Sequence, residues 1–219
     1  MNTALYKLIE EGEHQQQDFK FCINDSKKIA KSLVAFANTD GGRLLIGVKD
    51  NGKIVGISTD EEYYMVEAAA KIYSKPPIRF STRQWQSDGK IVLEIAVLPS
   101  TRKPHYARDE SGKWLAYIRL NDENILAHPI QLIVWKKEKY SRGIWFTYSD
   151  NEKFLVEYLQ KNKSISFPKF IRMAHISPKE AGDILSNFVI MEVIKIKTTP
   201  ENTLFVLNEE FDKKNFERF

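Results

Sequence analysis

The stretch AFANTDGGRLLIGVKDNGKIVGI, residues Ala35–Ile57, decides the fold. Its first part ends a helix that begins after Asn24-Asp25-Ser26, and the Thr-Asp-Gly-Gly turn that follows permits positive φ. The apolar run Arg43–Lys49 is typical of a strand buried on both faces. Asp50-Asn51-Gly52 predicts a hairpin turn into a short strand at Lys53–Gly56. The pattern indicates an α/β domain built around a central strand.

Helix and strand patterns continue on both sides of this stretch. Gln17–Cys22 is a strand candidate, Asp60–Ser74 has the length of a helix, and Lys90–Leu98 alternates as a strand does. The predicted fold class is α/β (α+β), a mixed sheet with helices, in a first domain of residues 1–140. A linker at residues 141–150 is expected to follow it.

Residues 151–219 have a different organisation, three short helical stretches and a β-hairpin. The third helix, Ser177–Phe188, begins with a serine cap, Pro178 at its first position and Glu180 in a capping box. This order predicts a winged helix. A base-reading helix brings Arg, Lys, Asn or Gln to base edges, and this helix has few of them. Packing against the first domain or a partner is therefore an equal alternative to duplex binding.

Composition excludes several classes of protein. The 219 residues carry 33 Lys and Arg against 29 Asp and Glu, a net charge of +4, which is too small to indicate a partner by itself. One cysteine excludes an internal disulfide and a zinc site of several thiolates. No run approaches the roughly 18 apolar residues of a membrane span, and no basic segment precedes an apolar one at the start. A cytoplasmic protein without a membrane partner is expected.

Gly47–Ile54 satisfies the phosphate-loop pattern G-x-x-x-x-G-K, but the next position is Ile54 rather than Ser or Thr. The hydroxyl that binds Mg²⁺ is therefore missing. A phosphate loop also joins a strand to the N-terminus of a helix, whereas here the turn is predicted to join two strands. ATP binding is not expected.

The block AFANT-x-GG-x-L-x-IGV-x-D-x-G-x-I-x-G, preceded by EHQQQDFK at Glu13–Lys20, resembles the AlbA-2 domain of Schlafen proteins and many prokaryotic proteins, also called the divergent AAA-4 domain. The resemblance continues through Pro76-Pro77, Ile91–Ser100, KPHY and YIR, and covers about residues 8–128. It implies contact with nucleic acid, DNA or RNA, in regulation or in defence against foreign nucleic acid.

The same resemblance implies an alternative, a metal-dependent ribonuclease that cuts structured RNA such as transfer RNA. Glu13 and Asp18 match the first two of the family's three acids, with Asp18 in place of the usual Glu, and Asp50 is the candidate for the third. Three carboxylates can hold Mg²⁺ or Mn²⁺ to activate water. Binding alone requires no cofactor. The competing interpretation is that these are solvated surface acids.

Nucleic-acid binding also uses basic side chains that contact phosphates and aromatic side chains that stack on bases. The loop STRKPHY concentrates such residues in a turn, and the connector KKEKYSRG at Lys136–Gly143 is the densest basic run in the chain. The alternative is that these charges are merely solvated on a protein-interaction or oligomerisation module. Because Schlafen proteins pair two related lobes, a homodimer is expected from the resemblance. The candidate nucleic-acid-binding residues are Lys20, Arg43, Lys49, Arg102, Lys103, His105, Tyr106, Arg119, Lys136, Lys137 and Lys139.

Overall fold

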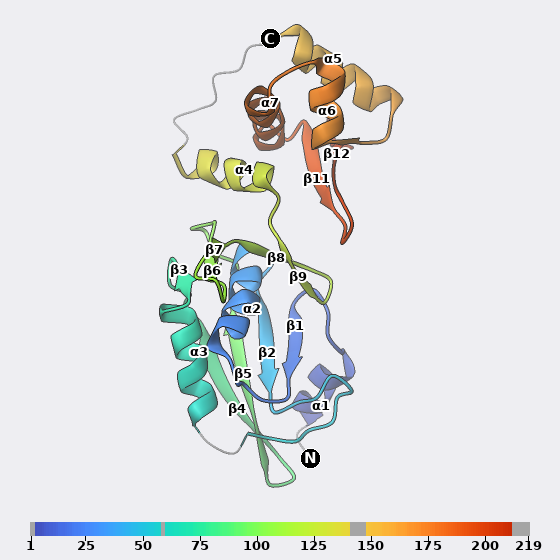
Figure 1. Cartoon of the computed structure of the whole chain (residues 1–219). Coiled ribbons are helices and arrows are strands. Elements are labelled where there is room, and N and C mark those ends of the chain that lie inside the picture. Colours follow the sequence, from blue (N-terminus) through green and yellow to red (C-terminus); the bar gives the residue numbers. More distant parts are fainter. Residues whose placement is uncertain (1–2, 58–59, 141–147, 212–219) are drawn as a thin grey trace. The chain divides into compact units, whose positions relative to one another are not determined.

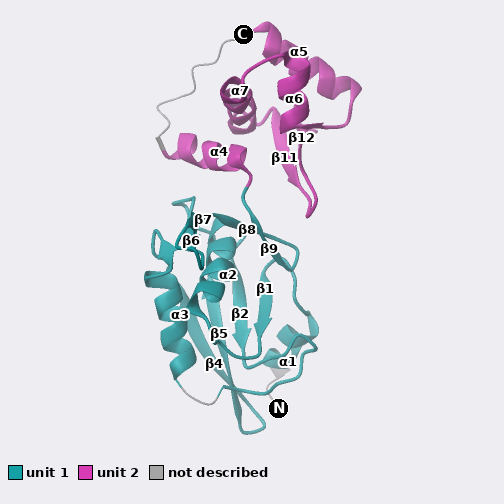
Figure 2. Ribbon diagram, viewed as in Figure 1, with its two compact units in different colours: residues 1–127 teal, residues 128–219 magenta. Residues whose placement is uncertain are grey.

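The computed structural model describes residues 3–57, 60–140 and 148–211 (Figure 1). They form two compact units, Met1–Ala127 and His128–Phe219 (Figure 2). In the described part of the chain, no helix is long and apolar enough to cross a membrane.

Unit 1 contains three helices and nine strands among its described residues. The helices are α1 (Thr3–Glu10), α2 (Ser26–Asn38) and α3 (Glu61–Lys71). The strands are β1 (Gln17–Lys20), β2 (Gly42–Ile46), β3 (Ser74–Lys75), β4 (Ser81–Ser87), β5 (Lys90–Val97), β6 (Tyr106–Arg108), β7 (Trp114–Leu115), β8 (Tyr117–Leu120) and β9 (Glu123–Leu126).

The main sheet has the strand order β1-β2-β5-β4. β1 and β2 are parallel and joined through α2, because parallel strands need a crossover. β2 pairs antiparallel with β5, and β5 antiparallel with β4. The sheet is therefore mixed, which confirms the predicted α/β class.

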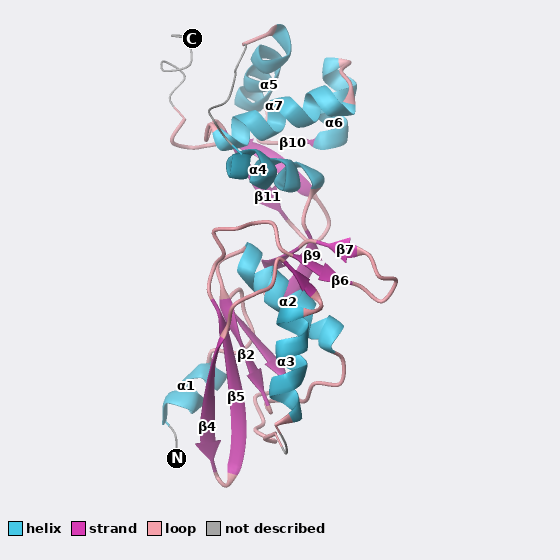
Figure 3. Ribbon diagram, turned by 90° about the vertical axis from the view of Figure 1, so that its left-hand side faces the viewer, coloured by secondary structure: helices cyan, strands magenta, loops and turns pink. Residues whose placement is uncertain are grey.

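The central strand β2 is buried on both faces, as its apolar run predicts. Leu44 and Ile46 pack in a core with α2 and α3, whereas Leu45 packs in a second core with α1. Successive side chains of a strand point to opposite faces, so one run of three residues serves both cores. Figure 3 shows α1 on one side of the sheet and α2 and α3 on the other.

The chain leaves β2 earlier than the sequence predicts, at Gly47 rather than Lys49. Gly47 has φ +95°, and a Cβ built there would lie 2.9 Å from the backbone of Gly56. A side chain is therefore excluded at this crossing. The strand expected at Lys53–Gly56 is wrong, because that segment turns back under Gly47 and makes only an isolated bridge, Val48 with Ile54.

Asn38 holds the C-terminus of α2 to two later segments of unit 1. Its side chain is 2% exposed. Its Nδ2 donates to the carbonyls of His105 and Tyr117, each at 2.9 Å, and its Oδ1 accepts from the amide of His105 at 2.8 Å. One side chain thus satisfies three backbone groups that would otherwise be buried without partners.

Unit 2 contains four helices, α4 (Pro129–Tyr140), α5 (Asp150–Lys161), α6 (Phe167–Ala174) and α7 (Pro178–Ile190), in its described part. Its strands, β10 (Ile165–Ser166), β11 (Ile194–Thr198) and β12 (Thr203–Leu207), form an antiparallel sheet of order β10-β12-β11.

Helix α4 belongs to unit 2, whereas the sequence analysis placed these residues in the first domain. Ile130 and Val134 share a core with Ile184 and Leu185 of α7. The unit boundary therefore lies at residues 127 and 128. An apolar helix face alone cannot tell which of two cores it joins, which is why the sequence placed this boundary too late. Most of the expected linker, residues 141–147, lies outside the described residues.

We expect Asn38→Ala to lower the opening free energy of unit 1 by about 3 kcal/mol or more, because each buried group left without a partner costs about 1–3 kcal/mol. Hydrogen exchange of the β2 amides measures this free energy. Gln84→Ala, an exposed amide on β4, is the control and should change it by less than about 0.5 kcal/mol. Equal effects of the two substitutions would contradict the structural role of Asn38.

Candidate functional site

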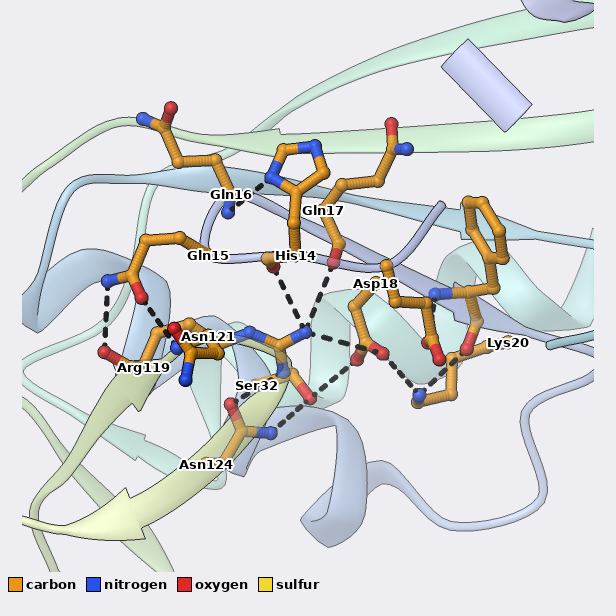
Figure 4. Close-up of polar contacts among 12 residues, drawn as sticks. His14, Gln15, Gln16, Gln17, Asp18, Lys20, Ser32, Arg119, Asn121 and Asn124 are labelled. Atoms are coloured by element: carbon orange, nitrogen blue, oxygen red, sulfur yellow. Dashed lines mark hydrogen bonds and ion pairs between the residues drawn. The ribbon is translucent and has the colours of Figure 1, made fainter. Parts of the chain in front are cut away.

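Asp18 lies in a polar network at the β1 edge of the main sheet (Figure 4). It is 4% exposed, and its Oδ1 accepts from Lys20 Nζ at 2.8 Å. Its Oδ2 accepts from the Ser32 hydroxyl of α2 at 3.3 Å. A neighbouring acid, Glu13, accepts the amide of Phe19 at 2.8 Å and hydrogen-bonds with Asp18. The sequence motif therefore brings its first two acids together.

Arg119 of β8 closes this network from the other side. Its side chain is buried, and its NH2 group lies 3.7 Å from Asp18 Oδ1 and donates to the carbonyl of Gln17 at 3.1 Å. Its NH1 group donates to Asn124 of β9 at 3.1 Å, and Asn124 donates to Ser32 at 2.9 Å. Arg119 thus joins β1, α2, β8 and β9 through hydrogen bonds (Figure 4).

The two acids have opposite pKa shifts. Burial of its carboxyl and the hydrogen bond with Asp18 raise the pKa of Glu13 to about 7. Burial opposes ionisation of Asp18 as well, but the hydrogen bond from Glu13 and the charges of Lys20 and Arg119 outweigh it and lower the pKa of Asp18. Below about pH 7 the pair therefore shares one proton, which resides on Glu13.

Asp50 does not join the other two acids. It is exposed in the turn after β2, and the described residues contain no group of three or more His, Cys, Asp or Glu side chains that could hold a metal ion. The lone pairs of Asp18 are directed at Lys20, Ser32 and Glu13. This donor set does not fit Mg²⁺ or Mn²⁺, because hard cations need several available oxygens rather than neighbouring ammonium and guanidinium groups.

Two predicted phosphate-binding residues point inward. His105 is 4% exposed, and its Nδ1 donates to the carbonyl of Pro76 at 2.9 Å, so its Nε2 accepts from the Ser100 hydroxyl at 2.7 Å. Burial lowers the pKa of His105, so the ring is neutral at physiological pH. Arg119 is equally enclosed in the β1 network. Both residues are structural in this conformation, which the sequence could not distinguish from exposure.

The other candidates of unit 1 differ in exposure. Lys49 is exposed, with its Nζ 5.3 Å from the ring centroid of the exposed Phe21. Lys20 is bound to Asp18, and Lys103 Nζ donates to the carbonyl of Thr39 at 3.3 Å. The half-buried candidates are Arg43 of β2 and Tyr106 of β6.

Arg102 is an exposed candidate on a loop of unit 1 whose backbone is held by hydrogen bonds. The amide of Ser100 donates to Ala37 of α2 at 2.8 Å, and the amide of Arg102 donates to the Ser100 hydroxyl at 3.0 Å. The backbone beneath Arg102 is thereby anchored, while its side chain is exposed.

In unit 2, Lys136 and Lys139 are exposed on α4, whereas Lys137 is bound to α7. Lys137 Nζ lies 3.0 Å from Asp183 Oδ1 and donates at 2.8 Å to Ser186 Oγ and to Asn187 Oδ1. Three polar side chains of the helix expected to read DNA are therefore bound by α4. Residues 141–143 of the basic connector lie outside the described residues.

A cavity of about 760 Å³ in unit 1 was missed by the sequence analysis. Its lining includes Arg79 and Phe80 before β4, and Leu98 and Arg102 after β5. The hairpin register could have indicated it, because pairing of Ser81 with Ala96 sets residues 76–80 beside residues 98–102.

We expect the side-chain carboxyl of Glu13 to titrate with a midpoint at about pH 7 in a carbon-detected NMR titration. Asp18→Asn should lower this midpoint without restoring the ordinary value of 4.5, because burial remains after the partner charge is lost. Folded Glu13 binds more protons than unfolded Glu13 between these two values, so its contribution to stability decreases as the pH rises through this window.

The control is Glu10→Gln on the exposed surface of α1, which should leave the Glu13 midpoint unchanged. Glu13→Gln keeps a hydrogen-bond donor and removes the titration, so it should abolish the stability loss that Glu13 causes. A midpoint near 4.5 in the wild-type chain would contradict the shared proton.

The comparisons with solved structures give low similarity. The crystal structure of the DIP2311 protein from Corynebacterium diphtheriae matches 89% of this chain and 34% of its own, at 16% identity and a TM-score of 0.45. The chain thus spans about a third of that protein. The solution structure of an N-terminal domain from Nitrosomonas europaea, from a protein described as related to the ATP-dependent DNA helicase RecG, matches 66% of this chain and 96% of its own, at 21% identity and a TM-score of 0.42.

No curated protein matches the chain in sequence. The family model described as "Schlafen, AlbA_2" matches residues 13–128, more than half of the chain. This range begins at Glu13, contains the whole β1 network, and ends at the unit boundary. The chain belongs to the Schlafen AlbA_2 family.

Proposed function

We propose that unit 1 binds nucleic acid through a basic surface formed by Arg79 and Arg102. The observation that carries this proposal is that two exposed arginines line one cavity. Arg79 precedes β4 and Arg102 follows β5, and these two strands pair with each other. Arginine forms bidentate hydrogen bonds with phosphate oxygens. Membership of the AlbA_2 family supports a nucleic-acid partner rather than a small anion.

The loop that carries Arg102 favours this function because it is ordered before binding. Hydrogen bonds from Ser100 to Ala37 and between His105 and Asn38 fix the loop at both ends. A pre-organised loop loses less conformational entropy when it binds a phosphate backbone. Arg102 is therefore the residue of the STRKPHY loop that we assign to phosphate contact.

We do not extend the proposal to the metal-dependent ribonuclease. Asp18 is paired with Lys20 beside Arg119, and Asp50 does not join Asp18 and Glu13. A metal centre requires ionised, available carboxylates. The acid pair instead supports a structural role, in which it fixes β1 against α2 and β8.

For unit 2 we propose a winged-helix-like module whose nucleic-acid contact is the β11–β12 hairpin rather than α7. Lys137 of α4 occupies Asp183, Ser186 and Asn187 of α7. The exposed Lys195 and Lys197 lie on β11. Their charges are available to phosphates without displacing α4 from its core.

We expect Arg79→Glu with Arg102→Glu to weaken binding of both single-stranded and duplex oligonucleotides by about tenfold or more, and to reduce the salt dependence of the binding constant. Fluorescence anisotropy at several salt concentrations measures both quantities. Lys7→Glu is the control with half of this charge change, because Lys7 is exposed on α1, which lies on the side of the sheet opposite α2 and α3. Binding that ignores salt, or equal loss in the control, would refute the proposed surface.

We expect Lys195→Glu with Lys197→Glu to weaken duplex binding by the full-length chain and to lower its salt slope by about 1–2. Lys179→Glu, at the exposed start of the helix α7 that would otherwise read bases, introduces half of that charge change. It should change affinity about twofold or less. A larger effect of Lys179→Glu would instead favour contact through α7.

A further inference from the structure

The cavity beside the Arg79–Arg102 surface has the size and lining of a ligand site. Its volume of about 760 Å³ lies within the range of about 300–1,000 Å³ that small-molecule sites occupy. Most of its lining is apolar, and includes Phe80, Leu98 and prolines 76, 77 and 99. Such walls accept a flat, weakly polar group of the size of a nucleobase.

The charge around the cavity favours an anionic occupant. Arg79 and Arg102 both line it and are exposed, and none of the described residues in its lining is acidic. A ligand with an apolar body and a flanking negative charge matches this distribution. A nucleotide within a strand has both parts, a base and its phosphates.

Several polar groups of the cavity are already engaged with one another. The Ser100 hydroxyl donates to His105 Nε2, His105 Nδ1 donates to the Pro76 carbonyl, and the Arg102 amide donates to Ser100 Oγ. Base identity is read by donors and acceptors directed at base edges. Since these groups satisfy one another, they do not discriminate among bases, and the apolar walls offer shape and stacking.

A row of aromatic rings continues from the cavity onto α3. Phe80 meets Tyr63 edge-on with ring centroids 6.3 Å apart, and Tyr63 meets Tyr64 at 5.7 Å. Tyr64 is 65% exposed, and Leu98 at the cavity is 82% exposed. Exposed rings next to cations are the recurring surface on which single strands stack their bases.

We propose that this cavity takes one unstacked base of a single-stranded nucleic acid while Arg79 and Arg102 hold its flanking phosphates. The proposal rests on the nucleic-acid binding proposed above and specifies the strand state that unit 1 selects. Bases in a duplex are stacked and paired, so a duplex reaches the arginines without filling the cavity. Single strands are therefore preferred, with weak sequence preference.

The test substitutes Leu98, because its exposure lets a charge be introduced without disturbing the core. Leu98→Glu places a negative charge at the cavity, and Ile72→Glu makes the same change at a residue that is 63% exposed after α3 and does not line the cavity. The probes are single-stranded homopolymers of about 12 nucleotides, a length within single-strand site sizes, and a duplex of the same length.

We expect Leu98→Glu to weaken single-strand binding about tenfold beyond the effect of Ile72→Glu, and duplex binding no more than Ile72→Glu does. Oligo(dT), oligo(dA) and oligo(dC) should bind the wild type within about tenfold of one another. Phe80→Leu, which removes the ring but keeps an apolar side chain, should also weaken single-strand binding selectively.

Different failures have different meanings. If the wild-type chain binds neither probe, both the proposed function and this inference are wrong. If it binds both probes in a salt-dependent way but Leu98→Glu and Phe80→Leu affect them equally or not at all, nucleic-acid binding stands and the base-holding cavity is refuted. A 2-aminopurine base in a single strand should increase in fluorescence on binding, because it is unstacked in the cavity. Loss of this increase in Leu98→Glu would support the cavity.

Discussion

The arrangement of unit 1 depends on the side-chain amide of Asn38. It joins the end of α2 to His105 in the loop before β6 and to Tyr117 at the start of β8. The loop places Arg102 and part of the cavity wall, and β8 carries Arg119 into the β1 network. A single buried amide thereby couples the loop at the cavity to the β1 network. Each of its hydrogen bonds must be made, because a buried amide without its partners would be costly.

The sequence predicts the centre of unit 1 better than its periphery. The apolar run around Leu44–Ile46 and the turn before it identify β2, because burial on both faces requires a continuous apolar strand. These signals are local, so the chain alone carries them. The Glu13 and Asp18 pair was instead expected from the family resemblance, and the structure brings the two acids together.

Other features depend on contacts between distant residues. His105 and Arg119 have the residue types of a phosphate site, but Pro76, Ser100 and Gln17 bind them inside the fold. Asp50 is four residues beyond the end of β2, yet Gly47 turns the chain so that this acid does not join the other two. Charge and spacing show which groups are present, and only tertiary packing decides which of them face the solvent.

The same limit explains the assignment of α4. Lys136, Lys137 and Lys139 form one basic run in the sequence, yet Lys137 satisfies three polar side chains of α7 while its neighbours are exposed. A lysine at the buried face of a helix stabilises a helix pair by charge-assisted hydrogen bonds, whereas one at the exposed face contributes to the field of the protein. The run therefore has two physical roles that the sequence presents as one.

The shared proton of Glu13 and Asp18 gives unit 1 a formal charge that depends on its surroundings. With Glu13 protonated, the ionised Asp18, Lys20 and Arg119 sum to one positive charge, and loss of that proton brings the group to neutrality. The change falls at about pH 7. The arginines of the cavity keep their charge throughout, because guanidinium groups do not titrate in this range. A modest acidification would therefore add positive charge to the acid pair beside β1 and leave the charges of Arg79 and Arg102 unchanged.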